Sequence, residues 1–246
     1  MIKKMRILWA LLWVGLISSF FFLTLEQWLI CLILGHIIGG IGQPIALHRY
    51  LTHKTFKTNK FWHYFLLYIS IIVGEGSSII YKSAHIKHHR YSDEKEDPHS
   101  PKYMGYWKVF FGYFFAKEED KRSMIYAKDL LRDKEHIFIH KHYFKIHALH
   151  FFTLLMISPI LVYALYIFPA MYSIIGAGFV NASGHYPEEA KNKTWVTLLF
   201  FDGHHKYHHE NPSEWYIPFP YLWINTFIRL IKSTSIDILC IMVYNV

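Results

Sequence analysis

The sequence predicts an all-α integral membrane protein, with four membrane-spanning helices in two hairpins and a histidine-rich helical cap on the cytoplasmic face. Three observations predict this fold. Of the 246 residues, 53% are hydrophobic and 18% are charged, which excludes disorder and disfavours a soluble domain. Long apolar runs occur near both ends of the chain. The 18 histidines gather mainly in short clusters between and after these runs. We treat residues 1–246 as a single domain.

The first hairpin is predicted from residues 7–24 and 28–47. The first run has no charge, and its 18 positions extend about 27 Å as a helix, close to the thickness of a hydrocarbon core. A cleaved signal peptide is the alternative, but the run is longer than a usual signal core and no Ala-x-Ala site follows it. The second run is interrupted only by His36, Gln43 and Pro44.

The distribution of positive charge gives the orientation. Lys3, Lys4 and Arg6 precede the first run, so the positive-inside rule places the N-terminus in the cytoplasm. Two crossings then return the chain to the cytoplasm at His48. Residues 48–145 contain 18 Lys and Arg against 11 Asp and Glu, which agrees with this side. We favour a multi-pass protein of a bacterial inner membrane over one of the endoplasmic reticulum.

A second hairpin is predicted from residues 146–167 and 170–186, turning near Phe168 and Pro169. The apolar stretch that contains both runs is long enough for two crossings and too long for one. The charged segment from Pro187 onward is therefore expected in the cytoplasm.

Residues 61–81 are also apolar, but they contain His63 and Glu75. If this segment crossed the membrane, the histidines after it would emerge on the opposite side from His48. A shared metal site requires one side, so we assign residues 61–81 to an interfacial amphipathic helix.

Three histidine motifs point to a metal site. They are an H-x4-H pair, His48 and His53, and two H-x-x-H-H motifs, His85, His88 and His89 and then His205, His208 and His209. Spacing i, i+3, i+4 places three imidazoles on one helical face. The i, i+5 pair does not share a face in an α-helix, so His48 is expected to end a helix and His53 to return from beyond it. Eight imidazoles exceed the needs of one zinc ion and suit two metal ions, with Zn, Fe, Cu and Ni all compatible.

These residues resemble the membrane-bound fatty acyl desaturases, specifically the acyl-CoA (delta-9, stearoyl-CoA) branch, which carries three histidine boxes in this order. His89-Arg-Tyr-Ser-Asp93 running on to Asp97-Pro98-His99 is similar to the family's extension of box two. Asn181-Ala-Ser-Gly-His185 is similar to its Asn-x-x-x-His motif, which supplies a ninth histidine and a water-linked asparagine. The resemblance covers residues from about 30 to 212.

The resemblance implies a di-iron centre that uses O2 to introduce a cis double bond into a saturated acyl chain. The implied iron ligands are His48, His53, His85, His88, His89, His185, His205, His208 and His209, with Asn181 as an additional cofactor-binding residue. Carboxylates outside this ligand set should orient the rings. Five are candidates: Asp93, Asp97, Asp202, Glu75 and Glu210.

Two departures from the family pattern affect the site. The usual Trp-Ala-x-x-His before box two is replaced by Tyr81-Lys82-Ser83-Ala84-His85, so the contacts to the acyl carrier differ here. Phe201-Asp202-Gly203-His204 replaces the usual Gly-Glu-Gly-Trp/Phe before box three. We interpret His204 as a supporting or solvated residue. His36, inside a predicted span, stays open between packing and function.

Electrons are expected from another protein. Cys31 and Cys240 cannot form an iron–sulfur site, and there is no dinucleotide fingerprint and no fused haem domain. The predicted partners are acyl-CoA or another acyl carrier, membrane lipid, and a ferredoxin or cytochrome b5-type donor with its reductase; no nucleic acid is expected. A basic surface that includes Lys87, Arg90, Lys95, Lys102, Lys121 and Arg122 could bind an acidic donor, acyl-carrier phosphates or anionic lipid.

Two other functions remain open. A di-iron membrane hydroxylase or other oxygenase of lipid or hydrocarbon would use the same centre. A membrane metal-binding or transport protein would place ligands along the middle of the membrane. The histidine clusters instead fall at or beyond the predicted helix ends and leave His36 as the only clear ligand within a span, which disfavours transport. The sequence leaves the chain length, the double-bond position, the acyl carrier and the oligomeric state undetermined.

Overall fold

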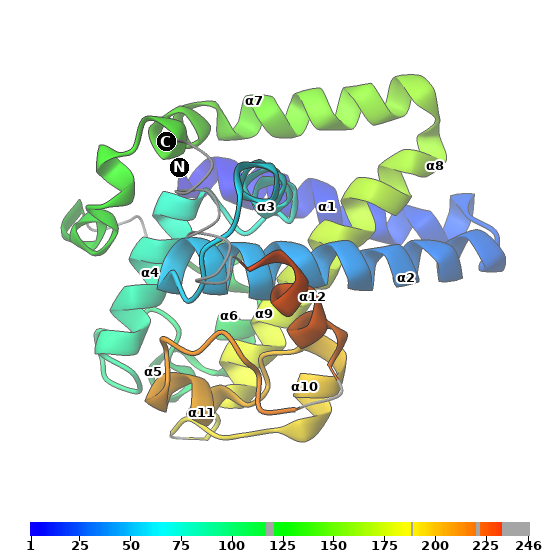
Figure 1. The fold of residues 1–246 in the computed structure, drawn as a ribbon. Coiled ribbons are helices and arrows are strands. Elements are labelled where there is room, and N and C mark those ends of the chain that lie inside the picture. The colour runs from blue at the N-terminus through cyan, green and yellow to red at the C-terminus, as the bar shows by residue number, and fades with distance from the viewer. Residues whose placement is uncertain (117–120, 188, 220–221, 233–246) are drawn as a thin grey trace, which may run out of the picture.

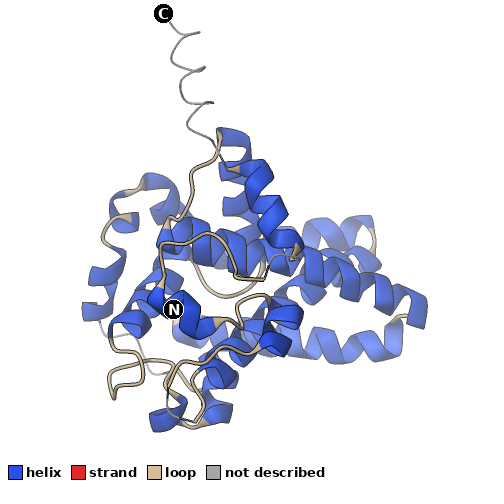
Figure 2. Ribbon diagram, turned by 60° about the horizontal axis from the view of Figure 1, so that its bottom comes forward, coloured by secondary structure: helices blue, strands red, loops and turns tan. Residues whose placement is uncertain are grey.

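The computed structural model describes residues 1–116, 121–187, 189–219 and 222–232, and these residues form no β-strand (Figures 1 and 2). Two isolated bridges join Thr58 to Lys232 and Asn192 to His204. The α-helices are α1 (Ile2–Phe22), α2 (Leu25–Gly40), α3 (Lys60–Ile72), α4 (Ser78–Arg90), α5 (Pro101–Met104), α6 (Tyr106–Phe110), α7 (Lys134–Ile157), α8 (Pro159–Val162), α9 (Phe168–Gly184), α10 (Thr194–Phe200), α11 (His205–Glu210) and α12 (Trp223–Ile231). Two π-helices, η1 (Ile41–His53) and η5 (Tyr163–Ile167), and three 3₁₀ segments, η2 (Gly112–Phe114), η3 (Lys121–Ala127) and η4 (Leu130–Arg132), complete the set.

The first predicted hairpin is present as α1 and α2. Thr24 caps α2 through a capping box with Gln27, which reverses the chain within two residues of the end of α1. Beyond α2 the helix continues into η1, through Pro44, to His53. Large apolar side chains on the outer faces of both helices are exposed, as expected of helices that contact lipid.

The predicted position of the second turn is wrong. The chain breaks at Ser158, whose backbone is extended, and not near Phe168 and Pro169. Helix then runs without interruption from Pro159 to Gly184. A proline clashes with the carbonyl four residues earlier, and the wider π-helix η5 directly before Pro169 accommodates it.

Three described helices are long and apolar enough to cross a membrane: Ile2–Phe22, Leu25–His53 and Pro159–Gly184. The 24-residue helix α7 lies beside them but is not among the three. Its histidines and lysines lower its hydropathy. The predicted run 170–186 agrees with α9 to within two residues at each end, whereas the predicted run 146–167 combines the C-terminal half of α7 with α8 and η5.

Residues 61–81 do not form the single helix that the sequence predicts. Helix α3 ends at Ile72, and a turn containing Gly74 and Gly76, both at positive φ, leads into α4. In Figure 1, α3 is seen nearly end-on, whereas α1, α2 and α7 lie across the view. The 13 residues of α3 extend only about 20 Å, too short to span.

Helix α9 connects the long helices to the cap. Its N-terminal part packs closely on α2, where a Cβ at Gly35 would approach the Phe168 carbonyl carbon to 3.1 Å. Its C-terminal end reaches the cap formed by α4, α5, α10 and α11 (Figure 1). The main apolar core runs through α1, η1, α3, α7, α9 and α12. The cap therefore sits at one end of the long helices.

Candidate metal centre

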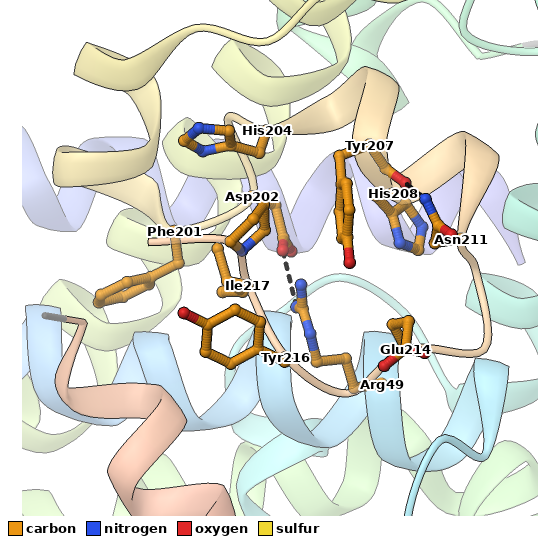
Figure 3. A pocket seen from close by; sticks show the side chains of 11 residues that line it. Arg49, Phe201, Asp202, His204, Tyr207, His208, Asn211, Glu214, Tyr216 and Ile217 are labelled. Atoms are coloured by element: carbon orange, nitrogen blue, oxygen red, sulfur yellow. Dashed lines mark hydrogen bonds and ion pairs between the residues drawn. The ribbon is translucent and has the colours of Figure 1, made fainter. Parts of the chain in front are cut away.

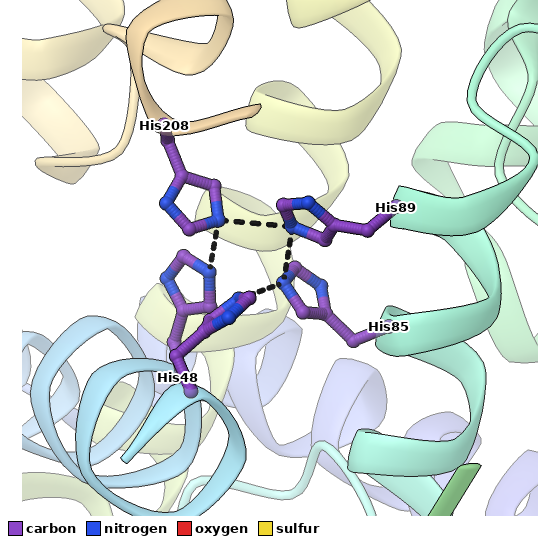
Figure 4. Close-up of side chains that lie close together, drawn as sticks. His48, His85, His89 and His208 are labelled. Atoms are coloured by element: carbon purple, nitrogen blue, oxygen red, sulfur yellow. Dashed lines mark hydrogen bonds between the residues drawn. The ribbon is translucent and has the colours of Figure 1, made fainter. Parts of the chain in front are cut away.

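All nine predicted histidines lie in two adjacent groups. Within each group, one ring nitrogen per residue lies within 4.8 Å of the others. The first group contains His48, His53, His85, His89 and His208. The second contains His88, His185, His205 and His209. Figure 4 shows four rings of the first group converging from three separate elements.

The π-helix η1 brings His48 and His53 together. We expected His53 to lie beyond the end of the helix, but η1 contains both residues. A π-helix bonds residue i to i+5, so two residues five apart lie nearly on one face. His53 Nε2 is 2.9 Å from His85 Nε2, and His48 Nε2 is 2.9 Å from His208 Nε2. The H-x4-H spacing is thus satisfied by an unusual helix.

Each H-x-x-H-H motif is divided between the two groups. On α4, His85 and His89 face the first group, with Nε2 atoms 3.0 Å apart, while His88 faces the second. On α11, His208 joins the first group, whereas His205 and His209 join the second. His88 Nε2 and His209 Nε2 are 3.1 Å apart. Both motifs therefore connect the two groups.

Three carboxylates hold the outer nitrogens of the rings. Asp202 Oδ2 lies 2.9 Å from His48 Nδ1, and Asp97 Oδ1 lies 2.8 Å from His88 Nδ1. Asp93 Oδ1 lies 2.9 Å from His185 Nδ1. When Nδ1–H donates to a carboxylate, the Nε2 lone pair points inward, as metal binding requires.

The other two predicted carboxylates do not contact the ligand set. Glu210 is exposed and lies 4.0 Å from Lys206. Glu75 is buried elsewhere and accepts a hydrogen bond from Ser173. The predicted orienting role is therefore wrong for these two residues.

The environment keeps the cap imidazoles neutral. Burial, together with neighbouring histidines, holds the pKa of His85, His88, His205 and His208 well below its usual range. Neutral imidazole is the form that binds metal. His185 Nε2 is buried and has no hydrogen-bond partner among the described residues. A buried nitrogen of this kind fits a metal ligand, because an unpartnered polar atom is otherwise costly.

Arg49 is a component of the site that the sequence did not indicate. It is buried beside His48, and its guanidinium lies 2.7 Å from Asp202 Oδ1. It also donates to the Trp215 and Pro44 carbonyls. Burial alone would raise the pKa of Asp202, but Arg49 and His48 lower it to about 2. An arginine near the end of an apolar run, next to a ligand, was the available signal.

A polar cavity adjoins the first histidine group at this ion pair. Figure 3 shows Arg49 and Asp202 with His208 among its lining residues. His204 also lines it, and its Nδ1 lies 2.7 Å from Thr197 Oγ1. His204 is in neither histidine group.

Of two other predicted residues, Asn181 lies near the site and His36 lies away from it. Asn181 lies in the last turn of α9, four residues before His185, which follows the last residue of that helix. His36 lies outside both groups, and its Nε2 accepts a hydrogen bond from Trp223 Nε1 at 3.2 Å. Its contacts are those of a packing residue.

Comparisons with known proteins place this geometry in a family context. Residues 23–223 match the family model described as fatty acid desaturase. The sn-1 stearoyl-lipid 9-desaturase of Anabaena variabilis is 27% identical over 194 residues, 73% of this chain and 70% of the relative. Delta-9 acyl-lipid desaturase 2 of Arabidopsis thaliana is 37% identical over 93 residues, 38% of this chain and 29% of the relative. Acyl-CoA desaturase 1 of Saccharomyces cerevisiae is 24% identical over 202 residues, covering 73% of this chain and 39% of the relative. The aligned part thus spans less than two thirds of the Arabidopsis and yeast relatives.

Proposed function

Because this chain belongs to the fatty acid desaturase family, we propose that it is an O2-dependent desaturase that introduces a cis double bond into a saturated acyl chain at a di-iron centre. The observation that carries the proposal is the pair of adjacent imidazole groups. Eight or nine neutral nitrogen ligands suit two metal ions and exceed what one zinc ion needs. Iron is chosen because the reaction uses O2.

In this proposal the first histidine group holds one iron and the second holds the other. The second group has four imidazoles, whereas the first has five. In this proposal Asn181 would supply the missing ligand of the second group through a water molecule. An all-imidazole set is neutral, so it does not cancel the positive charge of the metals, unlike the Glu-x-x-His ligands of soluble di-iron bundles. When bound, the iron pair supplies activation of O2 and removal of two hydrogens from an unactivated methylene pair.

The protein's own residues position the ligands and exclude water. Asp93, Asp97 and Asp202 fix the rings of His185, His88 and His48 with Nε2 directed inward. Arg49 keeps Asp202 ionised and in place. His88, His185 and His205 are at most 1% exposed, so solvent is kept from the second group.

We assign four membrane crossings to the chain, with α7 as the fourth beside the three apolar helices. Its 24 residues extend about 36 Å, enough to span. Large apolar side chains, including Leu149, Met156 and Ile157, are exposed on its C-terminal half, whereas its exposed lysines, Lys134, Lys141 and Lys145, lie in the N-terminal half. The elements that carry the histidine groups lie toward one end of the long helices, which supports a site on one face of the membrane (Figure 1). We propose that this is the cytoplasmic face of a bacterial inner membrane.

The proposed substrate is a saturated acyl chain on CoA, on another carrier or in a lipid, since relatives named for both acyl-lipid and acyl-CoA substrates match. The proposed electron donor is a ferredoxin or cytochrome b5-type protein with its reductase. Exposed Arg90, Lys95 and Lys102 form part of a basic surface that an acidic donor would fit.

The test supplies the purified, iron-loaded protein with a saturated acyl thioester or lipid, O2 and a reduced donor, and then compares olefin with alcohol. Olefin as the main product supports a desaturase. A product dominated by hydroxy acyl chains would favour the hydroxylase, which family membership does not favour. Absence of O2 consumption with every donor and carrier would count against an enzyme and in favour of a metal-binding or transport protein.

A further inference from the structure

Glu75 is a buried carboxyl group that the proposed metal site does not use. It lies in the turn between α3 and α4 and is only 7% exposed. Ser173 Oγ on α9 donates to its Oε1 at 3.3 Å. No described lysine, arginine or histidine forms an ion pair with it. A carboxylate in such surroundings would be an uncompensated buried charge, so the neutral acid is the stable form.

The turn that carries Glu75 is held from several sides. Trp9 Nε1 on α1 donates to the Gly74 carbonyl at 2.9 Å, and the Tyr113 hydroxyl donates to the Glu75 carbonyl at 3.1 Å. The Gly76 N–H donates to the Tyr143 hydroxyl on α7 at 3.0 Å. Fixing three consecutive residues in this way gives the carboxyl a defined position.

Helix α4, which carries three of the candidate ligands, follows this turn directly. Tyr81 stacks on the ligand His85, with ring centroids 5.5 Å apart, and its hydroxyl accepts a hydrogen bond from Gln43 at 3.0 Å. Burial raises the pKa of Tyr81, and the nearby Glu75 raises it further. Tyr81 therefore lies between the acid and the first histidine group.

A row of polar side chains on α7 leads to Glu75 from the exposed end of that helix. His136 Nδ1 lies 2.7 Å from Ser78 Oγ, and His140 Nδ1 lies 2.8 Å from Ser77 Oγ. Tyr143 is next on the same face, because the three residues are spaced by four and three positions. Glu135, in the first turn of α7, has a side chain that is 42% exposed. The row thus runs from the solvent-exposed first turn of α7 to Tyr143, which contacts the Glu75 turn at Gly76.

We propose that Glu75 holds a proton for the desaturation reaction, receiving it along the α7 row and passing it toward the metal centre past Tyr81. This inference rests on the proposed function. Desaturation with O2 takes two hydrogens from the acyl chain, two electrons from the donor and two protons from solvent. One C=C bond forms, the O–O bond breaks, and two water molecules leave. Each proton that Glu75 gives up is replaced from solvent.

Burial raises the pKa of Glu75 to about 8, with the Ser173 hydrogen bond opposing the rise. The groups nearest to it are the Ser173 hydroxyl and the phenols of Tyr81 and Tyr143, which are neutral at that pH. Tyr113 and Trp9 donate to the backbone carbonyls of the turn. The acid is therefore protonated at neutral pH and loses its proton above about pH 8. Glu75 does not touch the proposed ligands, so its role is one of positioning a proton.

The test compares E75Q, E75D and the matched surface variant E26Q, all iron-loaded. We expect E75Q to bind iron normally but to turn over roughly 100-fold more slowly and to release more hydrogen peroxide per O2 consumed. E75D should still use most of the O2 that it consumes to form olefin, with little release of hydrogen peroxide. The wild-type rate should fall above about pH 8, and this fall should be absent in E75Q.

The proposal is overturned if E75Q has the same rate and the same release of hydrogen peroxide per O2 as E26Q. The same conclusion follows if E75D is impaired as much as E75Q. It is also overturned if E75Q loses its iron, because the residue would then have a packing role. A wild-type protein that forms no olefin would instead contradict the proposed function itself.

Discussion

Three of the nine candidate ligand residues have one ring nitrogen in a histidine group and the other against a carboxylate. The inner nitrogens of His48, His88 and His185 meet the two histidine groups, while their outer nitrogens meet Asp202, Asp97 and Asp93. The convergence of the two H-x-x-H-H motifs could be predicted from their spacing, because imidazoles at i, i+3 and i+4 share a helical face, whereas His185 was predicted from the family resemblance. The pairing of each carboxylate with its ring could not be predicted from the sequence, since Asp202 and His48, for example, are 154 residues apart in the chain.

The residue-scale prediction concerns these carboxylates. D97N or D202N should lower iron affinity about 10- to 100-fold, because an amide can present the wrong group to Nδ1 and no longer fixes the ring. The matched control is E210Q, which changes an exposed carboxylate that contacts no ligand. Iron titration of the three purified variants measures the effect. Equal affinity in D97N and E210Q would contradict an orienting role for Asp97.

At the scale of helices, hydrophobic runs and motif spacing predict some elements of this fold but not others. Helices α1 and α2 follow from apolar runs and a capping box, and the spacing of box two correctly places α4. The π-helix η1 could not be read from periodicity, because the same apolar run also fits an α-helix. The break at Ser158 was missed because Pro169 was the more prominent interruption, although η5 absorbs it.

The element-scale prediction concerns the side of the membrane on which the cap lies. In a variant without Cys31 and Cys240, single cysteines at Lys95 and Glu189, both exposed, should react with an impermeant reagent from the same side. A cysteine at Glu26, in the first turn of α2, should react from the opposite side. Reaction of the cysteines at positions 95 and 26 from the same side would contradict the two-hairpin topology.

At the scale of the whole molecule, the resemblance to the desaturase family is confirmed by the match over residues 23–223. The histidine groups gather side chains from η1, α4, α9 and α11, which are widely separated in the chain. The two histidine groups thus join elements of the cap, in addition to its apolar packing. Two bound metal ions would act as cross-links between elements that otherwise meet through neutral imidazoles.

The whole-molecule prediction follows from this cross-linking. A ligand present at about 1,000 times its dissociation constant stabilises the folded state by about 4 kcal/mol. For a chain of 246 residues this corresponds to a rise in melting temperature of roughly 10 °C. Iron removal by a chelator should therefore lower the melting temperature by about that amount, and added Fe2+ should restore it. Thermal unfolding in detergent, with metal analysis of each sample, measures the change.

Ligand variants separate metal cross-linking from packing. H88A and H205A should start at a lower melting temperature, bind little iron and respond weakly to chelator, because each removes a buried member of the second group. H150A is the matched control, since His150 lies on α7, outside both groups, with its Nδ1 2.7 Å from the Tyr68 hydroxyl. It should respond to chelator as the wild type does. Full iron content in H88A and H205A would exclude these residues as ligands, and an unchanged melting temperature after verified iron removal would show that the cap is held by its packing alone.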